Sequence, residues 1–210
     1  MSELIVYGTP VSTYVRTVRL LLEEMGIEYQ LHSIDFFQGE NQSATYLAKN
    51  PFAKVPTLAI DRELIYETAA IADYLDTVFA DGRCSPTDPL LKARMRQIMG
   101  IIDSYLYPTA IGAVVWQRLI VPSQGGQPDL AKVNSVIEPM TTAIGAIESL
   151  ATCNPYLLGS SMSIADCYLI PIFVYLAQTP EFSVTMASAP QLQGWWERVS
   201  QLPSVKKVCA

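Results

Sequence analysis

The chain has 210 residues, of which half are hydrophobic, and it carries a formal net charge of -6. This length exceeds one typical domain and suits one small and one larger domain with substantial cores, which argues against disorder. The negative charge and the lack of any Lys/Arg run argue against a nucleic-acid partner. The four cysteines form no C-x-x-C pair, so neither a zinc site nor a disulfide framework is predicted.

Two further patterns concern membranes and secretion. The first residues enter a strand-like pattern without the basic and apolar regions of a signal peptide. The apolar stretch from Tyr168 to Ala177 is short and is broken by Pro171. We therefore expect a soluble, cytoplasmic protein with no membrane partner.

In chain order, the first 80 residues alternate strand and helix patterns. Residues 4–7 form a β-rich run, and apolar positions from 15 to 25 recur at helical spacing until Gly26. Further along, we expect a strand over 29–34, a short helix near 43–48, a hairpin of strands 57–60 and 63–66, and a helix over 67–78. The predicted order is β-α-β-α-β-β-α, an α/β domain over residues 1–80.

The rest of the chain is helical in pattern. Residues 81–89 are rich in turn formers and are predicted to be a linker. An all-α domain is predicted over residues 90–210, with helices over 90–119 interrupted at Pro108, about 130–151, 163–177 and 190–201. Cys209 is expected in a loose tail.

A turn segment from Lys49 to Leu58 reads KNPFAKVPTL. An isolated Val-Pro would be interpreted as an ordinary turn, but with its flanks the segment resembles the N-P-x-x-x-V-P-x-L signature of glutathione transferases. The resemblance implies a thioredoxin-like first domain, a helical-bundle second domain, and a cis bond between Val55 and Pro56. The Val55 backbone would then pair with an extended peptide. Because residues 1–83 contain no cysteine, the reactive sulfur would come from the ligand.

Eleven residues after Pro56, Glu67 and Thr68 stand where the last helix of this domain begins. A helix N-terminus attracts a carboxylate, Thr68 adds a hydroxyl donor, and Glu67 can accept from an ammonium. By resemblance, this pair would hold the γ-glutamyl head of glutathione, with Thr in place of the family's usual Ser. Capping of the helix is the structural alternative.

The segment from Thr9 to Arg16 reads TPVSTYVR. It resembles the loop of the Ser-type classes, in particular phi and theta, where a serine donates a hydrogen bond to the glutathione sulfur. Ser12 is the matching residue, and it can cap the first helix at the same time. Tyr7, Thr13 and Tyr14 remain alternatives for contact with the sulfur. Arg16 either steadies this loop, lines the site or is solvated.

One loop departs from the family. Phi-class relatives have basic residues where Asn41 and Gln42 align, and these hold the glycyl carboxylate of glutathione. Here that end would depend on Gln42 and on Lys54, with neutral hydrogen bonds in place of charge-assisted ones. A weaker affinity for glutathione or a different thiol would follow.

In the second domain, the segment from Ser163 to Asp166 resembles the family's buried N-capping box, a structural feature. Possible lining residues of an apolar acceptor pocket are Val11, Tyr107, Ile111 and Val115. The lone His32 has no partner at a spacing typical of a triad or metal site and is interpreted as structural.

The resemblance covers nearly the whole chain and implies a detoxifying glutathione transferase without a metal, with glutathione as co-substrate and an apolar electrophile as acceptor. A homodimer is expected, with Phe52 inserted between helices of the partner. The alternatives are a non-catalytic dimeric interaction module, or a glutathione-dependent isomerase, dehalogenase or peroxidase.

Overall fold

The computed structural model describes residues 3–36 and 38–210, so Met1, Ser2 and Phe37 lie outside the described residues. The chain divides into two compact units, Met1–Cys84 with Pro203–Ala210, and Ser85–Leu202. The last residues thus fold with the first unit, although the sequence predicted them as part of the helical domain.

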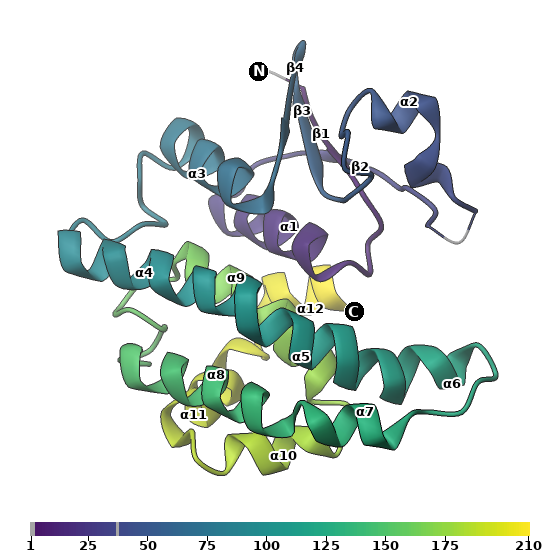
Figure 1. Ribbon diagram of the computed structural model, residues 1–210. Helices are drawn as coiled ribbons and strands as arrows, with labels where there is room; N and C mark the ends of the chain where they lie inside the picture. Colours follow the sequence, from purple (N-terminus) through teal and green to yellow (C-terminus); the bar gives the residue numbers. More distant parts are fainter. Residues whose placement is uncertain (1–2, 37) are drawn as a thin grey trace. The chain divides into compact units, whose positions relative to one another are not determined.

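The first unit is built on a four-stranded mixed sheet (Figure 1). Its strands are β1 (Leu4–Tyr7), β2 (Gln30–His32), β3 (Thr57–Ile60) and β4 (Glu63–Tyr66), in the order β2-β1-β3-β4. β1 pairs in parallel with β2 and antiparallel with β3, which in turn pairs antiparallel with β4. This is the predicted thioredoxin-like arrangement, with β2 three residues shorter than expected because only 30–32 pair with β1.

The helices of the first unit are α1 (Thr13–Met25), η1 (Glu40–Gln42), α2 (Ala44–Leu47), α3 (Thr68–Phe79) and α12 (Pro203–Cys209). α1 ends at Gly26, which has the left-handed conformation typical of a C-cap, with φ 69° and ψ 30°. α12 corrects the expected loose tail: Val205 and Val208 are buried, and the helix packs on α1.

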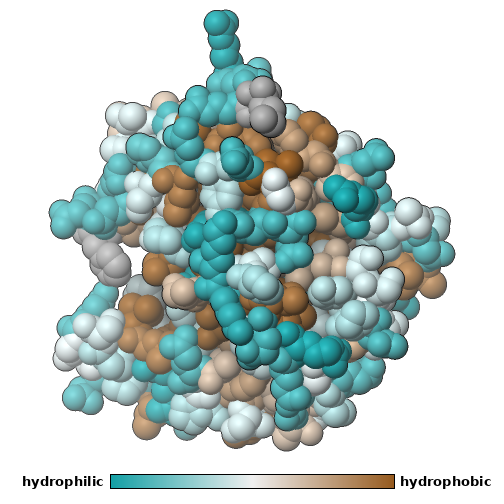
Figure 2. Space-filling view, turned by 180° about the vertical axis from the view of Figure 1, so that it is seen from behind, coloured by the Kyte–Doolittle hydropathy of each residue, from teal (hydrophilic) through white to brown (hydrophobic). Residues whose placement is uncertain are grey.

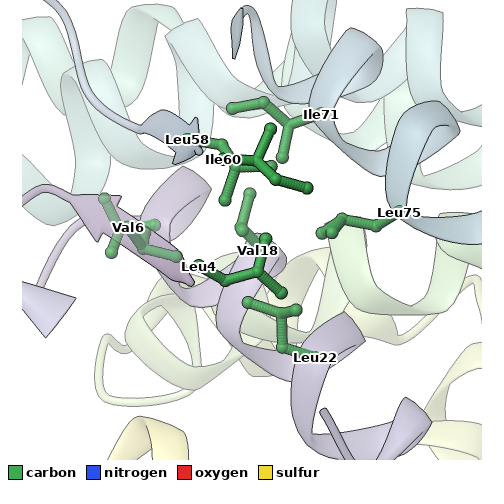
Figure 3. Close-up of a cluster of buried hydrophobic side chains, with 9 residues drawn as sticks. Leu4, Val6, Val18, Leu22, Leu58, Ile60, Ile71 and Leu75 are labelled. Atoms are coloured by element: carbon green, nitrogen blue, oxygen red, sulfur yellow. The ribbon is translucent and has the colours of Figure 1, made fainter. Parts of the chain in front are cut away.

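One apolar core holds the sheet to two of these helices (Figure 3). Leu4 and Val6 of β1 alternate with less buried neighbours, so both point to the same face. On that face they meet α1 residues such as Val18 and α3 residues such as Leu75. α1 and α3 therefore cover one face, and each is the next element after a strand: α1 follows β1 through the loop of residues 8–12, and α3 follows β4.

The second unit is all helical. Its elements are α4 (Pro89–Ile101), η2 (Ile102–Leu106), α5 (Tyr107–Thr109), η3 (Ala110–Ile120), α6 (Val121–Ser123), α7 (Leu130–Ser135), α8 (Ile137–Leu150), α9 (Ile164–Leu176), α10 (Glu181–Met186) and α11 (Pro190–Val199). The expected interruption at Pro108 is wrong. The run Pro89–Ser123 continues through it, because wider π-type turns in η2 and η3 accommodate the missing proline N–H.

By length and composition alone, this run could cross a membrane, and 44% of its most apolar window is buried in the structure; a single helix of this kind is weak evidence of a membrane span. Elsewhere on the surface, the face in Figure 2 has separate hydrophobic patches among hydrophilic residues. Phe52 is one of the large apolar side chains left exposed.

At the start of α9, Ser163 and Asp166 form the predicted capping box. Asp166 is completely buried and accepts hydrogen bonds from four donors. Two come from the backbone N–H and hydroxyl of Ser163, one from the Leu157 N–H and one from the Trp195 indole. The box therefore also fixes a loop and α11, which the sequence alone did not indicate.

Candidate active site

The register of the sheet gathers three loops at one end. Tyr7, the last residue of β1, is paired with Thr57, the first of β3, and Thr57 is paired with Tyr66, the last of β4. The segment that leads to Ser12 begins after Tyr7, and the segment with Val55 ends at Thr57. α3 begins just after Tyr66. Segments that are up to 60 residues apart in the sequence thus meet at one edge because of antiparallel pairing.

The first two loops are in close contact. A Cβ atom added to Gly8 would lie 2.4 Å from Val15 Cγ2 and 3.2 Å from Val55 Cβ. Only glycine fits at such a distance, so residue 8 lets the β1–α1 loop approach the loop that precedes β3. The Ser12 loop and the Val55 loop therefore form one continuous surface.

Ser12 is the N-cap of α1. It is half-buried with an extended backbone, and its Oγ accepts from the Val15 N–H at 3.5 Å, which is long for a hydrogen bond. Because a hydroxyl both accepts and donates, its proton remains available for another acceptor. The positive end of the helix dipole lies at the same place.

The alternatives to Ser12 lie in different surroundings. The ring of Tyr7 lies 5.0 Å from that of His32, and the Lys49 ammonium lies over it, 4.8 Å from its centroid. Thr13 is buried, with 5% of its surface exposed. Tyr14 is half-buried and lies within α1. Of these four residues, Ser12 is the one that is both half-buried and the N-cap of α1.

The Val55–Pro56 peptide bond is cis. Pairing of β3 begins at Thr57, so the backbone of Val55 lies outside the ladder and can pair with an extended ligand. The carbonyl just before it is tightly held: Lys54 O accepts from Tyr46 Oη at 2.7 Å and from Asn50 Nδ2 at 2.9 Å.

This support for the loop is not evident from the sequence. Tyr46 is 2% exposed and its hydroxyl also lies 3.2 Å from Thr57 Oγ1, while burial raises the pKa of the phenol. Asn50 accepts from the Phe52 N–H at 3.0 Å as well. The Asn-Pro pair within the motif indicated Asn50 only as a turn residue. Nothing in the sequence pattern pairs Tyr46 with a carbonyl eight residues away.

Asn41, one of the two neutral residues at positions that are basic in phi-class relatives, is buried. Its side chain is 8% exposed, and Nδ2 donates to the Ala53 carbonyl at 3.1 Å. Asn41 therefore holds the same loop at Ala53, whose φ is 54°. Gln42 and Lys54 are exposed, and both remain predicted ligands of the glycyl end.

Glu67 precedes α3 with φ 70° and ψ 117°, a strained backbone for a residue with a side chain. It is exposed, and it makes no side-chain capping hydrogen bond. Thr68 is the first residue of the helix and is half-buried. Glu67 thus occupies the N-cap position but does not cap the helix through its side chain, so that part of the structural alternative is wrong and the carboxylate is free of that role.

The predicted pocket residues differ in exposure. Val11 is 55% exposed in the first unit, and Tyr107 and Ile111 are half-buried in the second. Val115 is 3% exposed, so it presents almost no surface to a ligand. The prediction that Val115 lines the acceptor pocket is therefore wrong.

Two thiols of the chain itself, Cys84 and Cys153, are poor nucleophiles. Burial, with a smaller contribution from Asp76, raises the pKa of Cys84 to about 12, and burial raises that of Cys153 to about 12. Both are neutral thiols at pH 7. Within residues 3–36 and 38–210, no three His, Cys, Asp or Glu side chains cluster as a metal would require.

The two units define a thioredoxin-like sheet domain joined to a helical domain. Sequence models of two domains match the chain: "Glutathione S-transferase, N-terminal domain" over residues 11–78, and "Glutathione S-transferase, C-terminal domain" over residues 110–203. Glutathione S-transferase 1 of Triticum aestivum is 31% identical and the alignment covers 100% of this chain and 94% of the wheat protein.

Solved structures agree with these matches. A glutathione transferase of Populus trichocarpa has a TM-score of 0.86 at 29% identity, covering 98% of this chain and 97% of that one. A maize glutathione S-transferase I in complex with an atrazine glutathione conjugate has a TM-score of 0.84 at 27% identity, covering 98% and 96%. The chain belongs to the glutathione S-transferase family, which confirms the prediction made from residues 49–58.

Proposed function

We propose that the chain binds glutathione at the end of its sheet and transfers it to an apolar electrophile, with Ser12 as the donor to the sulfur. The observation that carries this proposal is the register that aligns Tyr7, Thr57 and Tyr66. It brings a helix-capping hydroxyl, an unpaired backbone segment and a second helix N-terminus to the same edge. A tripeptide thiol needs these three kinds of partner.

In the proposed reaction, the glutathione thiol releases its proton to solvent. The Ser12 hydroxyl and the N-terminus of α1 stabilise the thiolate, which is otherwise a minor species at pH 7. The sulfur then forms a bond to an electrophilic carbon, and either a leaving group departs with its electron pair or an adjacent double bond accepts the electrons and takes up a proton from solvent. Catalysis comes from orientation and from the thiolate formed in advance.

The rest of glutathione is held along the sheet edge. The Val55 backbone pairs with the cysteinyl residue, beside Pro56, while Glu67 accepts from the γ-glutamyl ammonium and Thr68 with the α3 N-terminus binds its carboxylate. Lys54 and Gln42 are the side chains that we assign to the glycyl carboxylate. The exposed positions of Glu67 and Lys54 support these roles.

We also propose a cytoplasmic homodimer. The Phe52 ring is 63% exposed and stands edge-on to Tyr66 at 6.0 Å, so a large apolar side chain extends from the same loop as Val55. Burial of such a side chain against helices of a second copy would be favourable. Sedimentation at micromolar concentration should give a dimer, and Phe52→Ala should shift it toward monomer. A species near 23 kDa alone would contradict the dimer.

The proposed activity is tested by titration of glutathione into the protein by calorimetry, followed by a panel of electrophiles. Binding together with conjugation supports the transferase. Binding without conjugation, when the thiolate absorbance is also missing, indicates a non-catalytic binding module. Isomerisation, dehalogenation or peroxide reduction would show as turnover of the corresponding members of the panel.

A further inference from the structure

Arg16 is a buried cation one turn into α1. Only 5% of its surface is exposed, and its Nε donates to the carbonyl of Pro10 at 3.1 Å. Burial of a guanidinium is unfavourable unless it is hydrogen-bonded, so an arginine is usually found at the surface. Because its side chain bonds the β1–α1 loop, its buried position indicates a role in holding that loop.

The hydrogen bonds of Arg16 surround Ser12. Its backbone N–H donates to the Ser12 carbonyl at 2.9 Å, and its side chain reaches back to Pro10, two residues before Ser12. Within the loop, the Ser12 N–H donates to the Thr9 carbonyl at 3.1 Å. The capping bond of the Ser12 hydroxyl is long, so the loop backbone and not the cap decides where that oxygen lies.

The C-terminal helix of the same unit packs on α1, and its Cys209 lies close enough to Arg16 to interact electrostatically. Burial raises the pKa of Cys209, and the nearby charges of Arg16 and Arg19 oppose that rise. α12 is tied to α1 by Arg19 Nη1, which donates to the Val208 carbonyl at 3.3 Å, and by a 2.8 Å ion pair between Lys207 and Glu23. Arg16 is thus hydrogen-bonded to the Ser12 loop and belongs to a helix that α12 holds in place.

We propose that Arg16 is a positioning residue, which holds the Pro10 carbonyl and thereby fixes the Ser12 hydroxyl where it donates to the glutathione sulfur. This inference rests on the proposed function of Ser12. Arg16 does not touch glutathione, and it acts through the loop that it braces. The planar Nε donor suits this task, because it bonds a carbonyl with one defined geometry.

The test compares Arg16→Met with Arg19→Met. Arg19 is a matched control on the same helix, since its Nε donates to Tyr29 Oη at 3.1 Å and its Nη1 to α12, but it does not bond the Ser12 loop. The readout is the pKa of enzyme-bound glutathione, followed by thiolate absorbance against pH. We expect Arg16→Met to raise this pKa so that roughly three- to tenfold less thiolate forms near pH 6.5. Glutathione affinity should stay within about twofold, because the head group binds elsewhere.

A double-mutant cycle with Ser12→Ala shows whether Arg16 acts through Ser12. We expect no further rise of the pKa when Arg16→Met is added to Ser12→Ala. An equal rise in both backgrounds, no rise in the native background, or an equal rise in Arg19→Met would each overturn the inference. Arg16→Lys keeps a cation without the planar donor, and it replaces Arg16→Met if that variant does not fold. In Arg16→Lys we expect a pKa of bound glutathione between the values in the native protein and in Arg16→Met.

The cycle also separates this inference from the proposed function. If Ser12→Ala leaves the pKa of bound glutathione unchanged, Ser12 is not the donor and the proposed mechanism fails. If Ser12→Ala raises the pKa and Arg16→Met does not, only the positioning role of Arg16 is wrong.

Discussion

Two regions of this molecule use hydroxyl and carboxylate residues at helix starts in contrasting ways: the start of α9 and the end of the sheet where α1 and α3 begin. At α9, the Asp166 carboxylate is completely buried and accepts four hydrogen bonds, two of them from Ser163. Burial raises the pKa of Asp166, and those donated bonds oppose the rise. At the sheet edge, Ser12 makes one long capping bond and Glu67 makes none.

The difference shows what separates a structural cap from a binding group of the same chemistry. At α9, every side-chain oxygen of Ser163 and Asp166 has a partner within the fold, so these hydrogen bonds contribute to the stability of the folded protein. At α1 and α3, the side chains keep free hydrogen-bonding capacity and are exposed or half-buried. Glu67 in addition keeps a strained backbone, a feature that concentrates at functional sites.

The largest expected effect is on stability. Asp166→Ala leaves four donors without their acceptor, so we expect a loss on the order of 3 kcal/mol or more in the free energy of unfolding by urea. Glu67→Gly relieves a positive φ and should change stability by a gain of up to about 1 kcal/mol. A similar loss in both variants would contradict the contrast between the two helix starts.

Ligand affinity should show the reverse order. Glu67→Ala and Thr68→Ala each remove a hydrogen bond to a charged group, which corresponds to roughly 1.5–3 kcal/mol, or about 10- to 150-fold weaker glutathione binding by calorimetry. Ser163→Ala is the control at α9: it should lose about 1 kcal/mol of stability and keep its glutathione affinity. Unchanged affinity in both site variants would show that the γ-glutamyl head binds elsewhere.

The sulfur donor distinguishes Ser12 from Tyr7. Ser12→Ala should raise the pKa of bound glutathione by about one unit, equivalent to about 1.4 kcal/mol, and lower turnover near neutral pH. Tyr7→Phe removes only a hydroxyl and should leave that pKa unchanged, since the ring keeps its contacts with His32 and Lys49. A rise in Tyr7→Phe alone would reverse the assignment.

The smallest effect concerns the support of the Val55 loop. Tyr46→Phe removes the donor to the Lys54 carbonyl and should weaken glutathione binding and stability by about 1 kcal/mol each. Tyr29→Phe is the matched control, because its hydroxyl accepts from Arg19 and donates to Glu23 away from this loop. It should lose stability without losing affinity. Equal affinities in the two variants would show that Tyr46 does not position Val55.

Local signals in the sequence determined the order β-α-β-α-β-β-α over residues 1–80, the family and the identity of the residues at the sheet edge. Strand and helix periodicities depend on neighbours within a few residues, and the motif from Lys49 to Leu58 is continuous in the chain. For the same reason the capping box from Ser163 to Asp166 was predicted, since its two members are three residues apart.

Only the tertiary structure decided how these residues are held and used. The contact of Tyr46 with Lys54, the burial of Asn41 and Arg16, and the return of α12 to α1 join positions that no local period relates. The same holds for Glu67, whose positive φ and missing capping bond follow from where β4 ends and not from its neighbours. A sequence pattern names the hydrogen-bonding groups of a side chain, but the fold determines which of them already have partners and which remain for a ligand.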